Sequence, residues 1–261
     1  MTIFGHELRR GKIAFIIWTA VIGFMLCVSI LIFPEMKKEM DSIGEMFSSM
    51  GAFTAAFGMD KLNFGQLSGY YSIECGNVLG LGGAFFAAML AAGMLSKEER
   101  GNTAEFLFTH PVSRTRVVSE KLLAVLAEIA ALNLIIFGIA AGAIAAIGET
   151  VPWKLMVLMH LAYFFMQLEL AGICYGVSAF IRKGGVGIGI GIAAFMYFLN
   201  IIANLTRDAE FLKYITPYGY CDGGDIAGKG NLDWLKVAVG LALGAAGVAA
   251  AYWQYRRKDI K

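Results

Sequence analysis

The chain is poor in charged residues. Only 16% of its 261 residues are Asp, Glu, Lys or Arg, and 58% are apolar. A typical soluble domain has about 25% charged and about 45–50% apolar residues. The composition therefore excludes an ordinary soluble domain and indicates a membrane protein. The formal net charge is only +2, and we expect no nucleic acid among its partners.

The chain also lacks the spacings of metal sites. Its cysteines form no CxxC pair, and its histidines form no HExxH motif. These residues are Cys27, Cys75, Cys174, Cys221, His6, His110 and His160. We expect no metal site and no catalytic residue in this chain. A disulfide between Cys75 and Cys221 stays an open alternative, because both could face the same compartment.

No phosphate-binding loop is present either. ATP hydrolysis needs a cradle of the form GxxxxGK[ST]. The nearest match is GGDIAGKG at Gly223–Gly230, in which Gly230 replaces the hydroxyl that binds magnesium. The sequence thus predicts a protein that is not an enzyme and binds no cofactor of its own. Any ATP and magnesium would belong to a separate protein.

Six apolar segments are long enough to cross a bilayer, which takes about 20 residues. They cover residues 13–33, 72–95, 122–147, 155–181, 186–205 and 235–252. We therefore predict an all-α polytopic membrane protein with one transmembrane domain over residues 1–261. The glycines that recur every four residues in the last two segments favour close helix packing, within the bundle, at a subunit interface or at a moving seam.

The distribution of basic residues predicts the orientation. The two ends of the chain, the loop at 96–121 and the loop at 182–183 together hold 14 of the 22 Lys and Arg residues. Short cytoplasmic loops carry an excess of Lys and Arg. We expect both termini and the 96–121 loop in the cytoplasm of a cell with a bacterial-type plasma membrane.

The sequence of the 96–121 loop predicts a short helix followed by a longer one. Asn102 can cap a helix, and Glu105 follows at the spacing of a capping box. Pro111 ends this helix, and Ser113 can cap the next one, which continues into the third span. The tip at 106–108 is apolar, so this helix could insert into a groove of a soluble partner or lie in the headgroup layer.

The segment ERGNTAEFLFTHPVSRTRVVSEKLLA closely resembles the loop after the second span in permease subunits of ATP-binding-cassette type-2 exporters. That loop has the pattern acidic–Gly–Thr–x–Glu–x–Leu–Leu–x–x–Pro–Val–Ser–Arg. The matching residues are Glu99, Thr103, Glu105, Leu107, Pro111, Val112, Ser113 and Arg114. Asn102 departs from the expected Gly, although Asn also tolerates left-handed backbone.

The resemblance implies that this loop carries a coupling helix that docks on a separate ATPase subunit. The docking residues would be Thr103, Glu105, Phe106, Leu107, Phe108, Pro111 and Arg114. It also implies two ATPase subunits for each complex and a second permease subunit, either identical or different. The N-terminal segment Ile3–Lys12 would be a connecting helix in the interface plane, ahead of the first span.

A few polar residues lie inside the apolar segments. Glu169 and Gln167 are in the fourth, and Glu128 is about two turns into the third. Charged groups at such depth face a bundle interior or a watery cavity, so these three are candidates for the substrate path or for structural pairing. Asn133 and Asn200 are expected to make interhelical hydrogen bonds. The loop at 35–70 has methionines at helical spacing, which predicts an amphipathic helix.

We therefore expect a dimeric exporter subunit that moves an amphipathic or hydrophobic substrate out of the cell. The cargo could be an antimicrobial or amphipathic peptide, a drug or a lipid-like molecule. An ATP-independent channel, or a membrane sensor or binding protein, remains the alternative.

Overall fold

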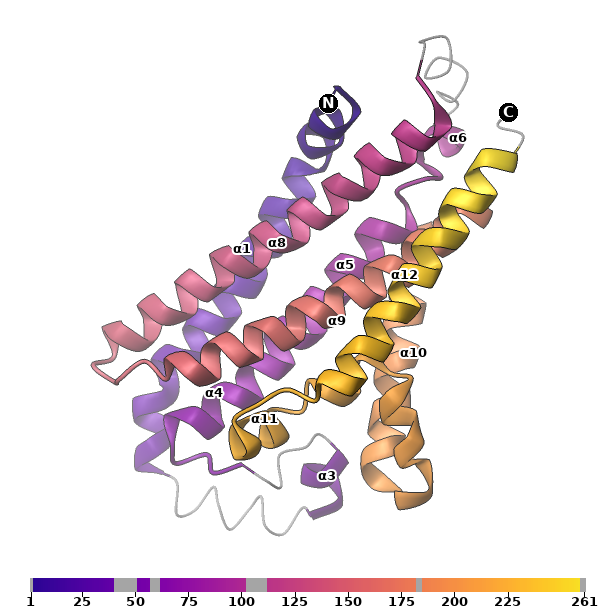
Figure 1. Cartoon of the computed structure of the whole chain (residues 1–261). Helices are drawn as coiled ribbons and strands as arrows, with labels where there is room; N and C mark the ends of the chain where they lie inside the picture. Colours follow the sequence, from indigo (N-terminus) through magenta and orange to yellow (C-terminus); the bar gives the residue numbers. More distant parts are fainter. Residues whose placement is uncertain (1, 40–50, 57–61, 102–111, 182–184, 259–261) are drawn as a thin grey trace.

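The computed structural model describes the chain except for residues 1, 40–50, 57–61, 102–111, 182–184 and 259–261. The described residues form a bundle of long helices and contain no strand. The beginning of the first helix and the end of the last one lie at the same end of the bundle, which we call the terminal end (Figure 1). The opposite end is called the far end.

Six helical segments are long and apolar enough to cross a membrane. They are α1 (Thr2–Lys38), the second span made of α4 (Leu67–Cys75), a π-helical segment η1 (Gly76–Leu81) and α5 (Gly82–Ala92), then α8 (Arg114–Ala146), α9 (Trp153–Phe180), α10 (Gly185–Leu205) and α12 (Trp234–Arg257). The all-α prediction with six spans is therefore confirmed.

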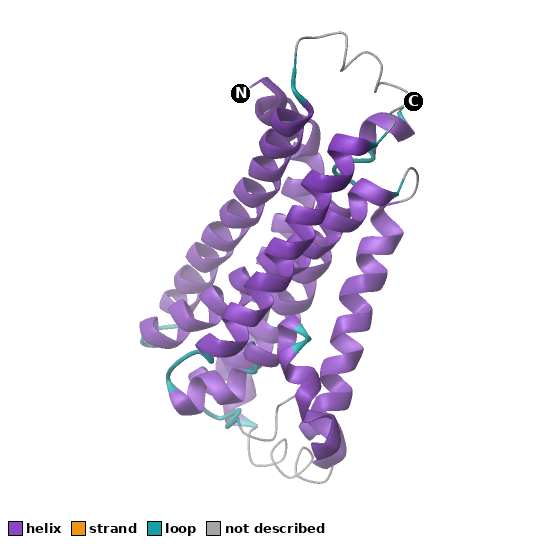
Figure 2. Ribbon diagram, turned by 45° about the vertical axis from the view of Figure 1, so that its right-hand side comes forward, coloured by secondary structure: helices purple, strands orange, loops and turns teal. Residues whose placement is uncertain are grey.

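Helix α9 lies at the centre of the bundle. It packs against α5, α8 and α12, whereas α1 packs mainly on α8 and α10 mainly on α5. The views in Figures 1 and 2 agree that α10 stands at the edge of the bundle. The most apolar stretch of α10 is 17% buried and that of α9 is 61% buried. Much of the α10 surface is thus free to contact lipid or another membrane helix.

The N-terminal segment differs from the expected connecting helix. Residues Ile3–Lys12 are helical, but they form the first turns of α1 and continue into the first span without a break. The physical reason lies in the sequence, since no proline separates this segment from the span and its two glycines only weaken a helix. The segment also packs against α8, as described below.

Glycines set the contact between α9 and α12. A Cβ on Gly172 would collide with the backbone carbonyl of Gly244, and a Cβ on Gly176 would lie 2.6 Å from the carbonyl of Gly247. Only glycine lets two helix backbones approach so closely. This close contact extends to Gly240, which packs directly on the carboxylate of Glu169.

The glycines of α10 divide between two faces. Gly185 and Gly189 pack on the backbone carbonyls of Ala92 and Ala88 in α5, so for them packing within the bundle is confirmed. A Cβ added at Gly187 or Gly191 would meet no atom of another described element within 4 Å.

Short elements close the far end. They are α3 (Gly51–Ala56), η2 (Arg207–Tyr214), η3 (Pro217–Tyr220) and α11 (Gly223–Lys229), and α6 (Lys97–Arg100) lies at the terminal end. The segment from η3 to α11 packs on α4 and α9. Most of the predicted methionine-rich helix falls outside the described residues. All four cysteines are free thiols, so the Cys75–Cys221 disulfide is not formed.

The α9–α12 contact predicts that a methyl group added at this contact destabilises the protein, whereas one added where a Cβ meets open space does not. We expect Gly172→Ala to destabilise the protein by about 1–3 kcal/mol, because overpacking forces the two backbones apart. Gly142→Ala in α8 is the matched control, since its Cβ would meet open space. Unfolding of the purified chain by SDS titration measures both. Equal stability of the two variants would show that this contact is not close in the protein.

Candidate functional site

Most of the expected docking residues lie outside the described part of the chain. These are Thr103, Glu105, Phe106, Leu107, Phe108 and Pro111. Both flanks of this loop are described, namely α6 before it and the first turns of α8 after it. Ser113 caps α8 as predicted, because its hydroxyl accepts a hydrogen bond from the backbone N–H of Arg116 at 3.2 Å. The start of α8, Arg114–Lys121, is therefore the first helical segment that the structure describes after the loop.

The start of α8 holds the N-terminus of α1. One carboxylate oxygen of Glu120 accepts the backbone N–H groups of Ile3 and Phe4, each at 3.0 Å. The other accepts a hydrogen bond from Arg116 Nε at 2.8 Å. The first N–H groups of a helix lack internal partners and carry partial positive charge, so a carboxylate there stabilises the helix end. Glu120 thus fixes where α1 begins relative to α8.

A buried charge cluster is centred on Lys121, the residue of α8 that directly follows Glu120. It consists of Glu7, Lys97, Glu98 and Lys121. The Lys121 ammonium donates to Glu7 Oε1 at 2.8 Å, to Glu98 Oε1 at 2.6 Å and to the carbonyl of Met94 at 2.9 Å. Lys97 donates to the other Glu7 oxygen at 2.9 Å. Lys121 has no exposed surface and Glu7 is 1% exposed. The cluster carries two positive and two negative charges and joins α1, α6 and α8.

The start of α8 also holds the C-terminus of α12. The Arg114 guanidinium donates to the backbone carbonyls of Lys258 at 2.6 Å and Arg256 at 3.2 Å. These are among the last carbonyls of the chain's final helix, which lack internal partners, and a cation stabilises them. Arg114, expected on the docking surface, therefore makes a structural contact with α12.

Lys258 continues this contact towards α9 and α6. Its ammonium donates to the carbonyl of Ile181, directly after α9, at 3.2 Å. It also lies 2.9 Å from Glu99 Oε1, an ion pair by distance without the alignment of a hydrogen bond. Both side chains are nearly buried. The end of α12 is thus tied to both neighbours.

Two tyrosines complete the contacts of the α8 start. Tyr175 of α9 donates to the carbonyl of Val118 at 2.6 Å, and Tyr252 of α12 lies 2.7 Å from the hydroxyl of Ser119. The first two turns of α8 therefore bind α1, α6, α9 and α12.

The three polar residues expected on the substrate path lie in different helix contacts. Glu169 is at the α9–α12 contact, where Tyr220 donates to its Oε2 at 2.9 Å. Gln167 faces α8 and α5: it accepts a hydrogen bond from Asn133 at 2.6 Å and packs on Gly83. The interhelical bond expected of Asn133 is therefore confirmed.

Glu128 lies apart from both, at the contact between α8 and α1. A Cβ on Gly11 would come within 2.7 Å of its carboxylate, and neither oxygen accepts a hydrogen bond from a described residue. Glu128, Gln167 and Glu169 are all at least 95% buried. The structure does not bring the three side chains to one cavity.

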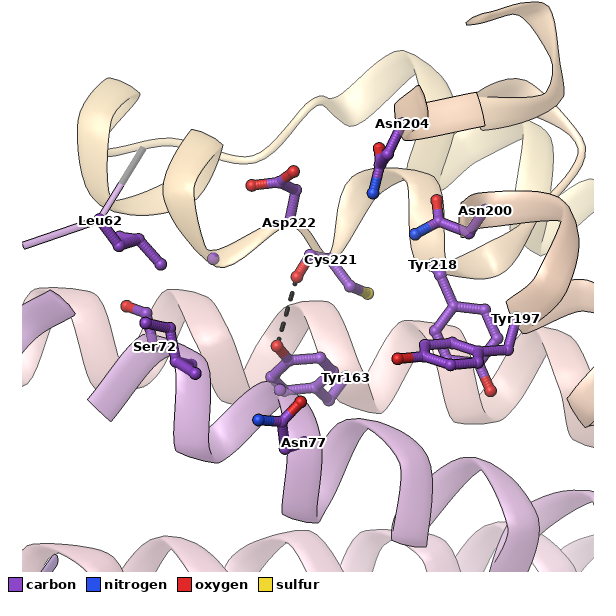
Figure 3. Close-up of a pocket in the computed structure, with 13 residues that line it drawn as sticks. Leu62, Ser72, Asn77, Tyr163, Tyr197, Asn200, Asn204, Tyr218, Cys221 and Asp222 are labelled. Atoms are coloured by element: carbon purple, nitrogen blue, oxygen red, sulfur yellow. Dashed lines mark hydrogen bonds between the residues drawn. The ribbon is translucent and has the colours of Figure 1, made fainter. Parts of the chain in front are cut away.

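A polar pocket at the far end was not predicted from the sequence (Figure 3). It lies between the second span, α9, α10 and the segment from η3 to α11, with a cavity volume of about 80 Å³. Its polar and aromatic lining residues are Ser72, Asn77, Tyr163, Tyr197, Asn200, Asn204, Tyr218 and Asp222. Asn200, expected to bond between helices, lines this pocket instead.

Cys221, in the same pocket, is not a reactive group. Burial raises the pKa of its thiol well above the ordinary value, so the thiol stays protonated near neutral pH. Its sulfur donates to the carbonyl of Pro217 at 3.4 Å, and its own carbonyl accepts the Tyr163 hydroxyl at 3.3 Å. The residue holds the segment before α11 against α9.

Comparison with known proteins gives a match to a family model. The family model described as ABC-2 family transporter protein matches residues 1–260, nearly the whole chain. No curated protein and no solved structure matches the chain.

The charge cluster predicts a large effect of removing its central cation. We expect Lys121→Met to lower the free energy of unfolding by about 3–5 kcal/mol, because Glu98 and Glu7 lose a buried partner. Lys38→Met is the matched control: Lys38 pairs with Glu35 on the exposed surface, and such pairs contribute about 0–1 kcal/mol. SDS titration measures both variants. A Lys121→Met protein as stable as Lys38→Met would contradict the buried cluster.

Proposed function

The chain belongs to the ABC-2 family of transporter proteins, and we propose that it is the membrane-spanning subunit of an ATP-driven exporter. As a member of this family it is a permease component of an ABC transporter. The energy source in this proposal is a separate ATPase subunit, since the sequence has no complete phosphate-binding loop.

The loop at 102–111 is the proposed docking element for that ATPase. Its apolar residues Phe106, Leu107 and Phe108 stand between polar neighbours, which suits insertion into a groove of a soluble protein. Thr103, Glu105 and Pro111 would shape the docking helix. Arg114 would fix the position of the α8 start that follows it, because it donates to the carbonyl of Lys258 at the end of α12. The proposed orientation, with both termini in the cytoplasm, would put this loop on the side where ATP is available.

The single observation that carries the proposal is the set of buried contacts at the start of α8. The cluster of Glu7, Lys97, Glu98 and Lys121 joins the two flanks of the loop to each other and to α1. In our proposal a force on the loop would therefore be transmitted to α1, α6 and α8 together, since separating these buried charges costs several kcal/mol. The first turns of α8 would instead move together with α1 and α6.

Helix α8 can carry this motion across the bilayer. It has 33 residues, which at 1.5 Å rise per residue is about 50 Å, longer than the hydrocarbon core of about 30 Å. No proline interrupts it. A tilt at the terminal end would thus shift the far end of α8, and α1 would follow because it packs along α8.

The proposed substrate is an amphipathic or hydrophobic molecule, such as a peptide, a drug or a lipid-like compound. Glu169, Gln167 and Glu128 are buried between helices in the state described here. In our proposal the switch to the second state opens these contacts, so that the three side chains line a path in turn. Glu169 would be uncovered by a separation of α12 from α9.

In the proposed assembly two permease subunits, identical or different, bind two ATPase subunits in a bacterial-type inner membrane. The lipid-facing surface of α10 leaves room for contact with lipid or with the second subunit.

Co-purification with the ATPase tests the proposal. We expect Phe106→Asp to abolish capture of the partner ATPase, because a charge at the docking tip cannot enter an apolar groove. Phe211→Asp is the matched control: Phe211 is an exposed phenylalanine of η2 at the opposite end and should leave capture unchanged. Undiminished capture by Phe106→Asp, or transport in liposomes without any ATPase, would overturn the proposal and favour a channel or a binding protein.

A further inference from the structure

A second cavity at the far end lies between the start of α9 and the short helix α11. Its volume of about 440 Å³ is within the range of about 300–1,000 Å³ that is usual for small-molecule sites. Its lining is mostly apolar and includes Trp153, Leu155, Leu158, Ile226 and Ala227. We call it the interface cavity. It shares no lining residue with the polar pocket of Figure 3, so the two are separate sites.

Lys154 is the charged residue of the interface cavity. Its side chain is exposed, and its ammonium lies beside Gly230, because a Cβ on that glycine would be 3.1 Å from Lys154 Nζ. Gly230 ends α11 with a left-handed φ of 61°. The lysine side chain therefore reaches across the cavity from the start of α9 to the end of α11.

Lys154 lacks the carboxylate partner that other lysines of the far end have. Three of these lysines lie within 3.2 Å of a carboxylate oxygen, namely Lys37 with Glu149, Lys229 with Asp225 and Lys236 with Asp233. Lys154 makes no hydrogen bond and no ion pair with a described residue. None of the described residues that line the cavity is acidic. The Lys154 ammonium is thus available to an anion from outside the chain.

Two exposed tryptophans mark the level of the cavity in the membrane. Trp153 begins α9 and is 58% exposed, and Trp234 begins α12 and is 52% exposed. Both helices begin at the far end (Figure 1). Tryptophan is enriched where the bilayer meets water, at the depth of the lipid head groups. The anions that are abundant at this depth are lipid phosphates.

The chemistry of the lining selects one class of ligand. An anionic lipid gains an ion pair with Lys154, and the first part of its acyl chains can lie against Leu155 and Leu158. A free inorganic anion would gain only the exposed ion pair, which is weak. A zwitterionic lipid carries a cation beside its phosphate, and Lys154 would repel that cation. Basic residues at the membrane surface attract anionic lipids in this way.

We propose that the interface cavity binds the phosphate head group of an anionic membrane lipid. The phosphate accepts hydrogen bonds from the Lys154 ammonium, and the glycerol backbone and upper acyl chains lie against Trp153 and Leu158. The bound lipid joins α9 to α11 and so holds the segment from η3 to α11 at the membrane surface. This inference goes beyond the proposed function and does not depend on it, because it involves no ATPase.

The test measures quenching of Trp153 fluorescence by brominated lipids in nanodiscs. The full chain carries Trp153 as its single tryptophan, after Trp18→Phe, Trp234→Phe and Trp253→Phe. Brominated phosphatidylglycerol is compared with brominated phosphatidylcholine at the same mole fraction. We expect an apparent affinity about fivefold higher for the anionic lipid, the ratio expected for one lysine beside an anionic head group.

Charge variants locate the lipid phosphate. Lys154→Met should abolish the preference, so that both lipids quench equally, and Lys154→Arg should keep it because it keeps the charge. Lys229→Met is the matched control, since it removes one positive charge from α11 outside the cavity and should leave the preference unchanged.

A cavity-filling variant tests the shape of the site with the charge in place. Ala227 is exposed and lines the cavity, so Ala227→Phe fills it without burying the new ring in the core. We expect this variant to weaken quenching by phosphatidylglycerol. Gly228→Phe is the matched control, because the next residue lies outside the cavity and a Cβ there meets open space.

Equal quenching of the parent chain by both lipids would overturn the inference. The same holds if Lys154→Met and Ala227→Phe both keep the preference, or if Lys229→Met loses it as fully as Lys154→Met. Inorganic phosphate serves as a competitor, with sodium sulfate at the same ionic strength as its control. Loss of the preference in phosphate but not in sulfate would assign the cavity to the free anion and reject the lipid.

Discussion

The structure depends on one constraint, which is that the Lys121 ammonium is buried and must keep its carboxylates. Its partners Glu7 and Glu98 belong to different elements, so the charge requirement fixes α1 and the segment before the 102–111 loop against α8. Replacing such a cluster by apolar residues can be neutral for stability, but separating its members is not. The main effect of the cluster is thus to set the positions of α1 and α6 relative to α8, rather than to add stability.

The relative position of the helices at the terminal end matters because α9 and α12 are in direct backbone contact elsewhere in the bundle. The α9–α12 contact at Gly172, Gly176 and Gly247 brings the two backbones together, so these two helices form one body in the state described here. The α1–α8 pair is held to that body at the terminal end by Arg114, Ser119 and Val118. In the proposed mechanism, motion between the two bodies would have its pivot beside the 102–111 loop and its largest effect at the far end, where the segment from η3 to α11 forms the polar pocket.

The sequence was sufficient for the fold class, the six spans and the Ser113 cap, because apolar length and capping chemistry are local properties. The connecting helix expected over Ile3–Lys12 is instead the first part of α1, because no proline separates this segment from the span, a signal that the sequence did contain. Arg114 was expected at the docking surface, but its contacts with α12 depend on residues more than 140 positions away. The charge cluster and the far-end pocket could not be predicted for the same reason. A π-helical turn such as Gly76–Leu81 also has no reliable sequence pattern, although its glycines were visible.

The most direct test of the account is the distance between the two bodies at the far end during the ATP cycle. Spin labels at Glu35→Cys in α1 and Gly228→Cys in α11 report it by pulsed electron resonance, in nanodiscs with the ATPase bound. The account predicts that trapping ATP changes this distance, and that adding Lys121→Met with Glu98→Gln abolishes the change while ATP hydrolysis continues. The same change of distance in the cluster variant would contradict the claim that the buried charges transmit the motion.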